Sequence, residues 1–268
     1  MNKLKILYLR DKRIYIFLII IIFFSILTIS LIDFHTNNSS KIEITHIEEQ
    51  NICDDSCIEE EEKNKRKDML LQKYKEKKLL ALTFDDGPSK YTEKLVDELK
   101  KRNVNATFFL LGENAQKFPS TIKFEIDAGN EIGIHSYKHN LFTKLTNNEI
   151  NEQILLTKYI IFNEVDIDIS LIRVPYGSIN NRVEELIKDN NLTSILWTVD
   201  SKDWKFRNVD KIYNYVLKNI KGNDIILMHD IYNTSVTSAL MLVDKLQSEC
   251  YVFVTVSEFL EIEKLANN

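Results

Sequence analysis

The chain has 268 residues, of which 44% are hydrophobic and 28% are charged, and this composition is typical of one globular domain with attached segments. Its formal net charge is -5, so the protein lacks the positive field that attracts a polyanion, and we expect no nucleic-acid partner. Cys53, Cys57 and Cys250 are too few for a disulfide framework and lack the paired spacing of a structural zinc site, although one bridge between Cys53 and Cys57 stays open.

An uncharged run from Ile14 to Ile32 is the first strong signal along the chain, and it is long enough to cross a hydrocarbon core of about 30 Å. Five basic residues precede it: Lys3, Lys5, Arg10, Lys12 and Arg13. The positive-inside rule therefore predicts a cytoplasmic N-terminus at 1–13, a single transmembrane anchor at 14–32 and an extracellular remainder. A cleaved signal peptide is the alternative, but the run is longer than a usual apolar signal region and no A-x-A site follows it.

Residues 33–78 carry charge in blocks and few apolar side chains, which predicts a solvated extracellular stalk. Glu59–Glu62 form the main acidic block, and basic residues follow it directly. Met69–Lys78 could form a helix, but the composition favours a charged spacer.

From residue 79 to residue 268, short apolar runs alternate with longer segments of helical spacing. We expect strands at Leu79–Asp85, Ala106–Leu111, Glu131–His135, Leu171–Pro175, Ile195–Val199, Asp224–His229 and Tyr251–Val254. We expect helices at Thr92–Arg102, Asn147–Phe162, Asn180–Asn190, Val209–Ile220 and Ser235–Ser248. This series predicts an α/β fold with a parallel sheet, either open or closed into a barrel.

Polar residues and glycines gather where these strands are expected to end. They are Asp85-Asp86-Gly87, His135, Arg173 to Gly177, Asp200 to Trp204, and His229-Asp230. Each group alone has a simpler explanation, such as an acidic turn or a satisfied buried histidine. Because parallel strands of a barrel deliver their C-terminal ends to one shared rim, the groups together indicate an active site there.

These residues form five ordered motifs that resemble the signature of the polysaccharide deacetylases of carbohydrate esterase family 4, which share the NodB-homology domain. The motifs are Thr83-Phe84-Asp85-Asp86-Gly87, His135-Ser136-Tyr137-Lys138-His139, Arg173-Val174-Pro175-Tyr176-Gly177, Asp200-Ser201-Lys202-Asp203-Trp204 and Leu227-Met228-His229. The resemblance covers roughly residues 79 to 257 and assigns 79–268 to a deacetylase domain. It implies a distorted (β/α)7-type barrel with the active site at the C-terminal ends of the strands, and hydrolysis of N-acetyl groups on cell-wall polysaccharide.

The resemblance implies a divalent metal ion bound by Asp86, His135 and His139. One carboxylate and two imidazoles suit zinc and leave positions open for water and substrate, while cobalt or another ion stays possible. Iron oxygenases use the same ligand types, but the serial strand–helix pattern argues against that class.

The remaining roles also follow from the resemblance. Asp85 is expected to act as the catalytic base beside the cation of Arg173, and Tyr176 is expected to donate its backbone N–H to the oxyanion. We attribute the convergence of Asp85 and Asp86 on one mouth to the turn at Gly87-Pro88, since consecutive strand residues normally point to opposite faces.

On the other side of the site, the resemblance makes His229 the general acid, with Asp203 as the carboxylate that orients it. Trp204 and Leu227 are expected to line the pocket for the acetyl methyl group. No key position departs from the family pattern, which disfavours a non-catalytic wall-binding protein.

The expected substrate is N-acetylglucosamine of peptidoglycan. The related enzymes that act on N-acetylmuramic acid typically carry Arg where this chain has Tyr176, although Lys205 or Arg207 could supply a cation instead. Deacetylation of N-acetylmuramic acid, chitin oligomers or poly-N-acetylglucosamine and removal of O-acetyl groups from xylan remain alternatives. The expected partners are thus cell-wall glycan and the membrane, and no protein partner is indicated.

Overall fold

The computed structural model describes the backbone of residues 55–267 and the side chains of residues 64–267. The expected cytoplasmic segment, the transmembrane run Ile14–Ile32, residues 33–54 of the stalk and the side chains of Cys53 and Cys57 lie outside this part. Among the described residues, no helix combines the length and apolar character that a membrane span requires. The contacts divide the chain into Met1–Glu60 and Glu61–Asn268, and the second unit holds the fold described below.

Helix α2 (Asp55–Tyr74) occupies a stretch for which the sequence favoured a charged spacer. The difference arises from tertiary contacts of its last turns. Tyr74 is buried in a cluster with Val256 and Phe259, and Leu70 packs against the same cluster. Arg66 adds an exposed ion pair to Glu261 at 3.4 Å.

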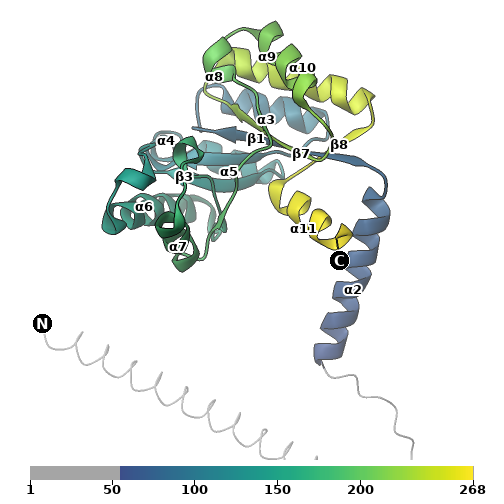
Figure 1. The fold of residues 1–268 in the computed structure, drawn as a ribbon, viewed down its shortest axis with the longest axis horizontal. Helices are drawn as coiled ribbons and strands as arrows, with labels where there is room; N and C mark the ends of the chain where they lie inside the picture. The colour runs from purple at the N-terminus through teal and green to yellow at the C-terminus, as the bar shows by residue number, and fades with distance from the viewer. Residues whose placement is uncertain (1–54, 268) are drawn as a thin grey trace, which may run out of the picture. The chain divides into compact units, whose positions relative to one another are not determined.

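One parallel sheet forms the centre of the fold (Figure 1). Its strands are β1 (Lys78–Asp85), β2 (Thr107–Leu111), β3 (Glu131–Ser136), β4 (Leu171–Ile172), β5 (Thr193–Ser194), β6 (Val199–Asp200), β7 (Asp224–His229) and β8 (Tyr251–Val254). Seven of them follow the order β5-β4-β3-β2-β1-β7-β6, and β8 pairs with the first half of β1. This curled sheet is the one expected of a distorted (β/α)7-type barrel.

The prediction of a strand at Ile195–Val199 is wrong. Instead, β5 ends at Ser194 and β6 begins at Val199, with an irregular segment between them. The carbonyl groups of Ile195 and Leu196 accept hydrogen bonds from the Arg173 guanidinium at 3.3 and 3.2 Å. Leu196 and Trp197 belong to neither β5 nor β6. The backbone can therefore leave the sheet here, and the Trp197 side chain lines the pocket described below.

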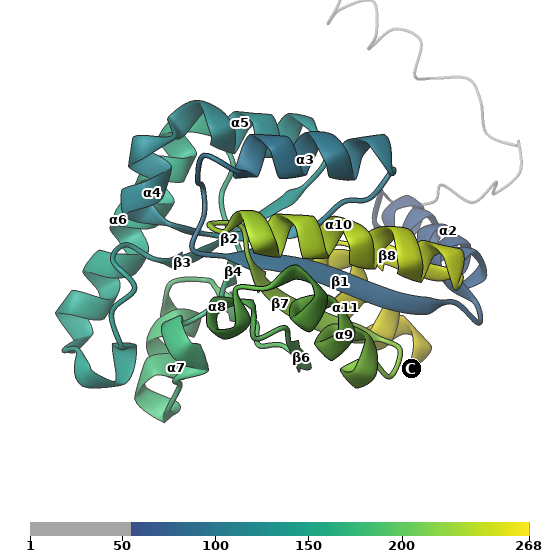
Figure 2. The ribbon, with the colours of Figure 1, turned by 90° about the horizontal axis from the view of Figure 1, so that it is seen from above.

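The helices follow the strands in the expected alternation. They are α3 (Thr92–Lys101), α4 (Gly112–Lys117), α5 (Pro119–Asp127), α6 (Asn147–Val165), α7 (Asn181–Asp189), α8 (Asp203–Phe206), α9 (Val209–Asn219), α10 (Asn233–Ser248) and α11 (Val256–Ala266). Two helices begin with complete capping boxes, at Thr146 with Glu149 and at Thr255 with Glu258. Figure 2 shows α3 and α10 running beside each other over β1.

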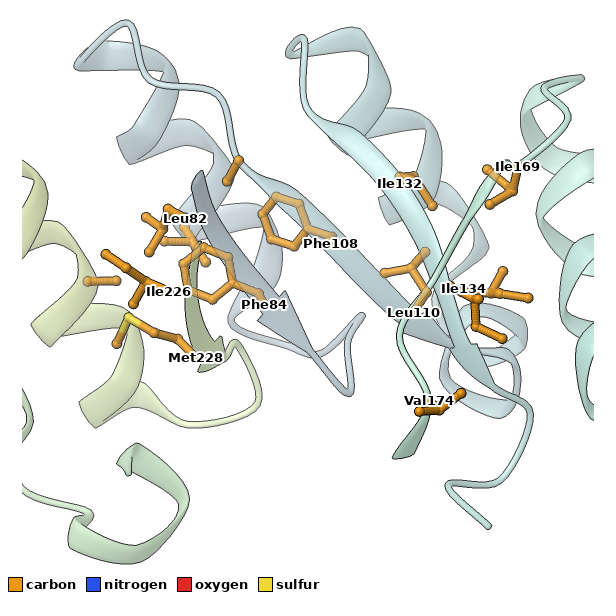
Figure 3. Close-up of a cluster of buried hydrophobic side chains, with 14 of the residues drawn as sticks. Leu82, Phe84, Phe108, Leu110, Ile132, Ile134, Ile169, Val174, Ile226 and Met228 are labelled. Atoms are coloured by element: carbon orange, nitrogen blue, oxygen red, sulfur yellow. The ribbon is translucent and has the colours of Figure 1, made fainter. Parts of the chain in front are cut away.

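Alternation along β1 divides the core into two layers. Leu80, Leu82 and Phe84 face the helices and join the larger cluster, part of which Figure 3 shows around Phe108 and Ile226. The intervening residues belong to the opposite face, where Leu79 and Ala81 join the second cluster. Because side chains alternate with a period of two, Thr83 and Asp85 continue this second face, which brings Asp85 to the interior side of the curled sheet.

Candidate metal and catalytic site

A pocket of about 420 Å³ lies at the C-terminal ends of the strands. Its lining residues are Asp85, Asp86, His135, His139, Tyr176, Trp197, Asp200, Trp204, Leu227 and His229. Arg173 and Asp203, the other two site residues named from the sequence, are fully buried and bonded to Asp85 and His229. A larger groove of about 750 Å³ lies along α2 and α11, and none of the residues of the five motifs lines it.

Trp197 and Asp200 line the pocket although the sequence analysis gave neither a role. Asp200 is the first residue of the fourth motif, and Trp197 lies three residues before it. Its position three residues before the fourth motif is the signal that could have identified Trp197.

Asp86, His135 and His139 bring three potential metal ligands together. The Asp86 Oδ1 atom lies 3.6 Å from the Nε2 atoms of both histidines, and the three donor atoms lie within 4.8 Å of one another. Ligands bonded to one zinc ion at about 2.1 Å in a tetrahedron lie roughly 3.4 Å apart, so this spacing fits a divalent ion. Asp86 Oδ1 is also buried and accepts no hydrogen bond from the described part of the chain, as a ligand atom would be.

Local bonds orient both imidazoles. The His135 Nδ1–H group donates to the Arg173 carbonyl at 2.6 Å, which leaves the Nε2 lone pair facing Asp86. His139 lies in a compact loop rather than on a helix, with a left-handed φ of 58°, and its N–H donates to Ser136 Oγ at 2.8 Å. Burial, followed by the nearby charge of His135, lowers the pKa of His139, so its imidazole is neutral and available as a ligand at physiological pH.

The neighbouring Asp85 is held by a buried cation. Arg173 NH1 donates to Asp85 Oδ1 at 2.8 Å and to Thr83 Oγ1 at 2.7 Å. Its guanidinium stacks 4.2 Å from the centre of the Phe109 ring, which keeps water away from the pair. Burial lowers the pKa of Arg173 and the charge of Asp85 opposes this, and an arginine so paired stays protonated.

Asp86 itself explains how two consecutive carboxylates share one pocket. Its φ of 73° lies in the left-handed region, so the alternation of β1 ends after Asp85. The convergence that we attributed to Gly87-Pro88 therefore begins one residue earlier, at a position where short polar side chains are tolerated.

His229 and Asp203 form the second charged pair. Asp203 Oδ1 lies 2.7 Å from His229 Nδ1, and Asp203 Oδ2 accepts the His229 backbone N–H at 2.8 Å. Burial is the largest single influence and would lower the pKa of His229, but the bond to Asp203 and the charges of Asp203, Asp85 and Asp86 together raise it to about 9. The imidazole is therefore protonated at neutral pH and can donate a proton from Nε2.

The curled parallel sheet and the Asp–His–His cluster with two flanking charged pairs fit a polysaccharide deacetylase barrel, and the family comparisons agree. The family model for polysaccharide deacetylase matches residues 72–195. A peptidoglycan-N-acetylglucosamine deacetylase of Bacillus cereus is 37% identical over 190 residues, which cover 69% of each chain. The chain belongs to the polysaccharide deacetylase family, as its five motifs implied.

Two further relatives carry different sugars in their names. The peptidoglycan-N-acetylglucosamine deacetylase PgdA of Listeria monocytogenes is 41% identical over 187 residues, or 69% of this chain. The peptidoglycan-N-acetylmuramic acid deacetylase PdaC of Bacillus subtilis is 40% identical over 188 residues, or 70% of this chain. In both cases the matched region spans 40% of the relative's length.

A solved structure of PdaC confirms the predicted fold class. It superimposes with a TM-score of 0.68 at 40% sequence identity, over 72% of this chain and 94% of that structure.

The metal site can be tested by replacing one histidine at a time. His139→Ala should reduce bound zinc from about one ion per chain to a small fraction, because two ligands hold zinc far more weakly than three. His229→Ala is the matched control and should keep the ion, since its Nε2 lies 4.0 Å from Asp86 Oδ2 and outside the cluster. Elemental analysis of the purified variants measures both, and equal zinc content in the two variants would refute the ligand assignment.

The His229–Asp203 pair predicts a pH dependence. In the metal-free protein, NMR titration should give His229 a pKa near 9, so the charge is present at neutral pH and is lost as pH rises through that value. The stability that the pair contributes should likewise be complete below the ordinary histidine pKa of about 6.5 and disappear toward pH 9. Asp203→Asn should lower this pKa, and an unchanged titration in that variant would contradict the pairing.

Proposed function

We propose that the protein is a membrane-anchored, metal-dependent deacetylase that removes the acetyl group from N-acetylglucosamine in cell-wall peptidoglycan. The observation that carries this proposal is the arrangement within one pocket: a base candidate and an acid candidate flank a three-ligand metal cluster. Amide hydrolysis needs an activated water, a stabilised oxyanion and a protonated leaving amine, and the pocket offers a group for each.

The chemistry divides between the two charged pairs. A divalent ion held by Asp86, His135 and His139 would supply a Lewis acid for the acetamide carbonyl and acidify the attacking water. Asp85 takes one proton from that water as its oxygen attacks the carbonyl carbon, and Arg173 keeps the carboxylate aimed at the pocket. His229 then gives its Nε2 proton to the sugar nitrogen as the C–N bond breaks, so that acetate and the free amine leave.

Other residues hold the acetyl group. The Tyr176 backbone N–H donates to the oxygen that becomes negative, which stabilises the tetrahedral intermediate. Leu227 and Trp204 form apolar walls of the pocket that suit a methyl group. Trp197 adds a third wall, and its ring lies 5.7 Å from the Arg173 guanidinium.

The choice of N-acetylglucosamine is supported by the charges at the rim. A site for muramic acid benefits from a cation that meets its lactyl carboxylate, but the Arg207 guanidinium donates to the Trp204 carbonyl at 2.8 Å and stacks on Tyr232. Lys202 is paired with Asp200 at 2.7 Å, whereas Lys205 is exposed and makes no ion pair within residues 64–267, so it stays the cation that a muramic acid site could use. The relatives of Listeria and Bacillus cereus named for N-acetylglucosamine support the same choice.

The anchor is part of the proposal because peptidoglycan lies outside the cell membrane. The uncharged run Ile14–Ile32 and the basic residues before it support a single span with the catalytic domain outside. This placement would keep the enzyme close to newly made wall on its own cell.

The substrate is tested with purified peptidoglycan. Treatment with the full chain and zinc should release acetate and leave glucosamine in the muropeptides, as tandem mass spectrometry would show. The same chain stripped of metal by a chelator should release none and regain activity when zinc is restored. Acetyl loss confined to muramic acid would reject the sugar assignment, and no release from any acetylated glycan would reject the deacetylase proposal.

The topology is tested on intact cells from which the wall has been removed. Added protease should release the folded domain into the medium, because residues after the span lie outside. A cytoplasmic marker protein should stay intact in the same sample. Protection of the domain in cells whose other surface proteins are cleaved would show that the orientation is inverted.

A further inference from the structure

Asp230 directly follows the acid candidate His229, yet the proposed chemistry leaves it without a role. It is fully buried at the end of β7. Its carboxylate accepts a hydrogen bond from the Thr92 hydroxyl, and its backbone carbonyl accepts one from Ser89 Oγ at 2.8 Å. Both donors lie just after the loop that carries Asp85 and Asp86, so Asp230 joins that loop to the strand end of His229.

The same loop is held from its other side. The Leu111 N–H donates to the Gly87 carbonyl at 3.0 Å, and Asn114 Nδ2 donates to the Asp86 carbonyl at 2.8 Å. The loop therefore lies between the end of β2 and Asp230, and movement of either support would move Asp86.

Gly87 shows how closely the loop and Asp230 approach. A Cβ atom on Gly87 would lie 2.6 Å from both carboxylate oxygens of Asp230. This distance is too short for a non-bonded contact, so one of the two residues would have to move. Gly87 does not have a positive φ, so its backbone conformation does not require glycine. The carboxylate, rather than the backbone conformation, therefore excludes a side chain at this position.

We propose that Asp230 is a positioning residue that docks the Asp85–Asp86–Gly87 loop against the end of β7. Its contacts set the separation between the ligand Asp86 and the acid His229, whose Oδ2 and Nε2 atoms lie 4.0 Å apart. Misplacement of reacting groups by about 1 Å can cost two orders of magnitude in rate, so this docking affects both metal affinity and turnover. The inference concerns the assembly of the site and holds whichever acetylated sugar is the substrate.

A double-mutant cycle between Gly87 and Asp230 tests the contact. Gly87→Ala alone should weaken zinc binding and lower kcat by about 10-fold or more, because its methyl group displaces the carboxylate and the loop with it. In the Asp230→Ala background the space is free, so adding Gly87→Ala should change either quantity by no more than about 2-fold. Equal losses in both backgrounds would overturn the proposal.

Two further variants separate shape from charge. Asp230→Asn keeps the volume and an acceptor for the Thr92 hydroxyl, so it should retain zinc affinity and kcat within about 3-fold of wild type. Thr92→Val, which removes the hydroxyl at constant volume, should weaken zinc binding by about 3-fold to 10-fold and serves if Asp230→Ala does not fold. Loss in Asp230→Asn as large as in Asp230→Ala would contradict a docking role.

Zinc affinity is measured by calorimetry on the full chain in detergent, without substrate, alongside thermal unfolding. Ser238→Ala is the control: Ser238 is also a fully buried polar residue, but its hydroxyl bonds the Thr234 and Val209 carbonyls and not the loop, and zinc affinity should not change. A wild type that deacetylates no glycan would reject the proposed function, while the calorimetric cycle would still decide the role of Asp230. Zinc affinity that simply follows thermal stability across all variants, Ser238→Ala included, would overturn the positioning role.

Discussion

The buried guanidinium of Arg173 is the group on which the rest of the site depends. It is fully buried, so each of its N–H groups needs an acceptor inside the protein. Those acceptors come from two separate places, β1 and the irregular segment after β5, and the Arg173 carbonyl additionally orients His135. Loss of one partner of such a buried pair typically costs about 3–5 kcal/mol, because the other charge remains without compensation.

The two charged pairs of the pocket differ in the sign of the charge that faces it. On one side, Asp85 faces a permanent positive charge that cannot be removed by a change of pH. On the other side, His229 faces Asp203 and carries a proton at neutral pH. An anionic and a cationic side chain thus flank the candidate metal ligands, which is the arrangement that an acid and a base in the proposed reaction require.

Much of the fold follows from local patterns in the sequence. The expected strands at Leu79–Asp85, Asp224–His229 and Tyr251–Val254 agree with β1, β7 and β8 to within one residue. Strong alternation and buried apolar runs decide these strands. Helix α2 was not favoured because its charged composition conceals two residues, Leu70 and Tyr74, that become apolar contacts only once the rest of the domain is present.

The site shows the same division. Residue types at strand ends identify the pocket, because a parallel barrel brings those ends together. Backbone details were not accessible in this way. The irregular segment at Ile195–Trp197 is held by Arg173. The left-handed Asp86 has its carbonyl bonded by Asn114, which also lies far along the chain. The contact between Gly87 and Asp230 is likewise invisible to a sequence pattern, since it joins the first motif to the residue that follows the fifth.

In the proposed mechanism Asp85 activates water while its neighbour Asp86 binds the metal, and a single variant separates these roles. Asp85→Asn keeps the size of the side chain and leaves Asp86, His135 and His139 in place. Zinc content and deacetylation rate should be measured on the same preparation of this variant. The variant should hold about one zinc ion per chain, as in wild type, and its rate should be lower by about 10²-fold to 10⁴-fold. A variant that binds zinc and deacetylates at the wild-type rate would contradict it.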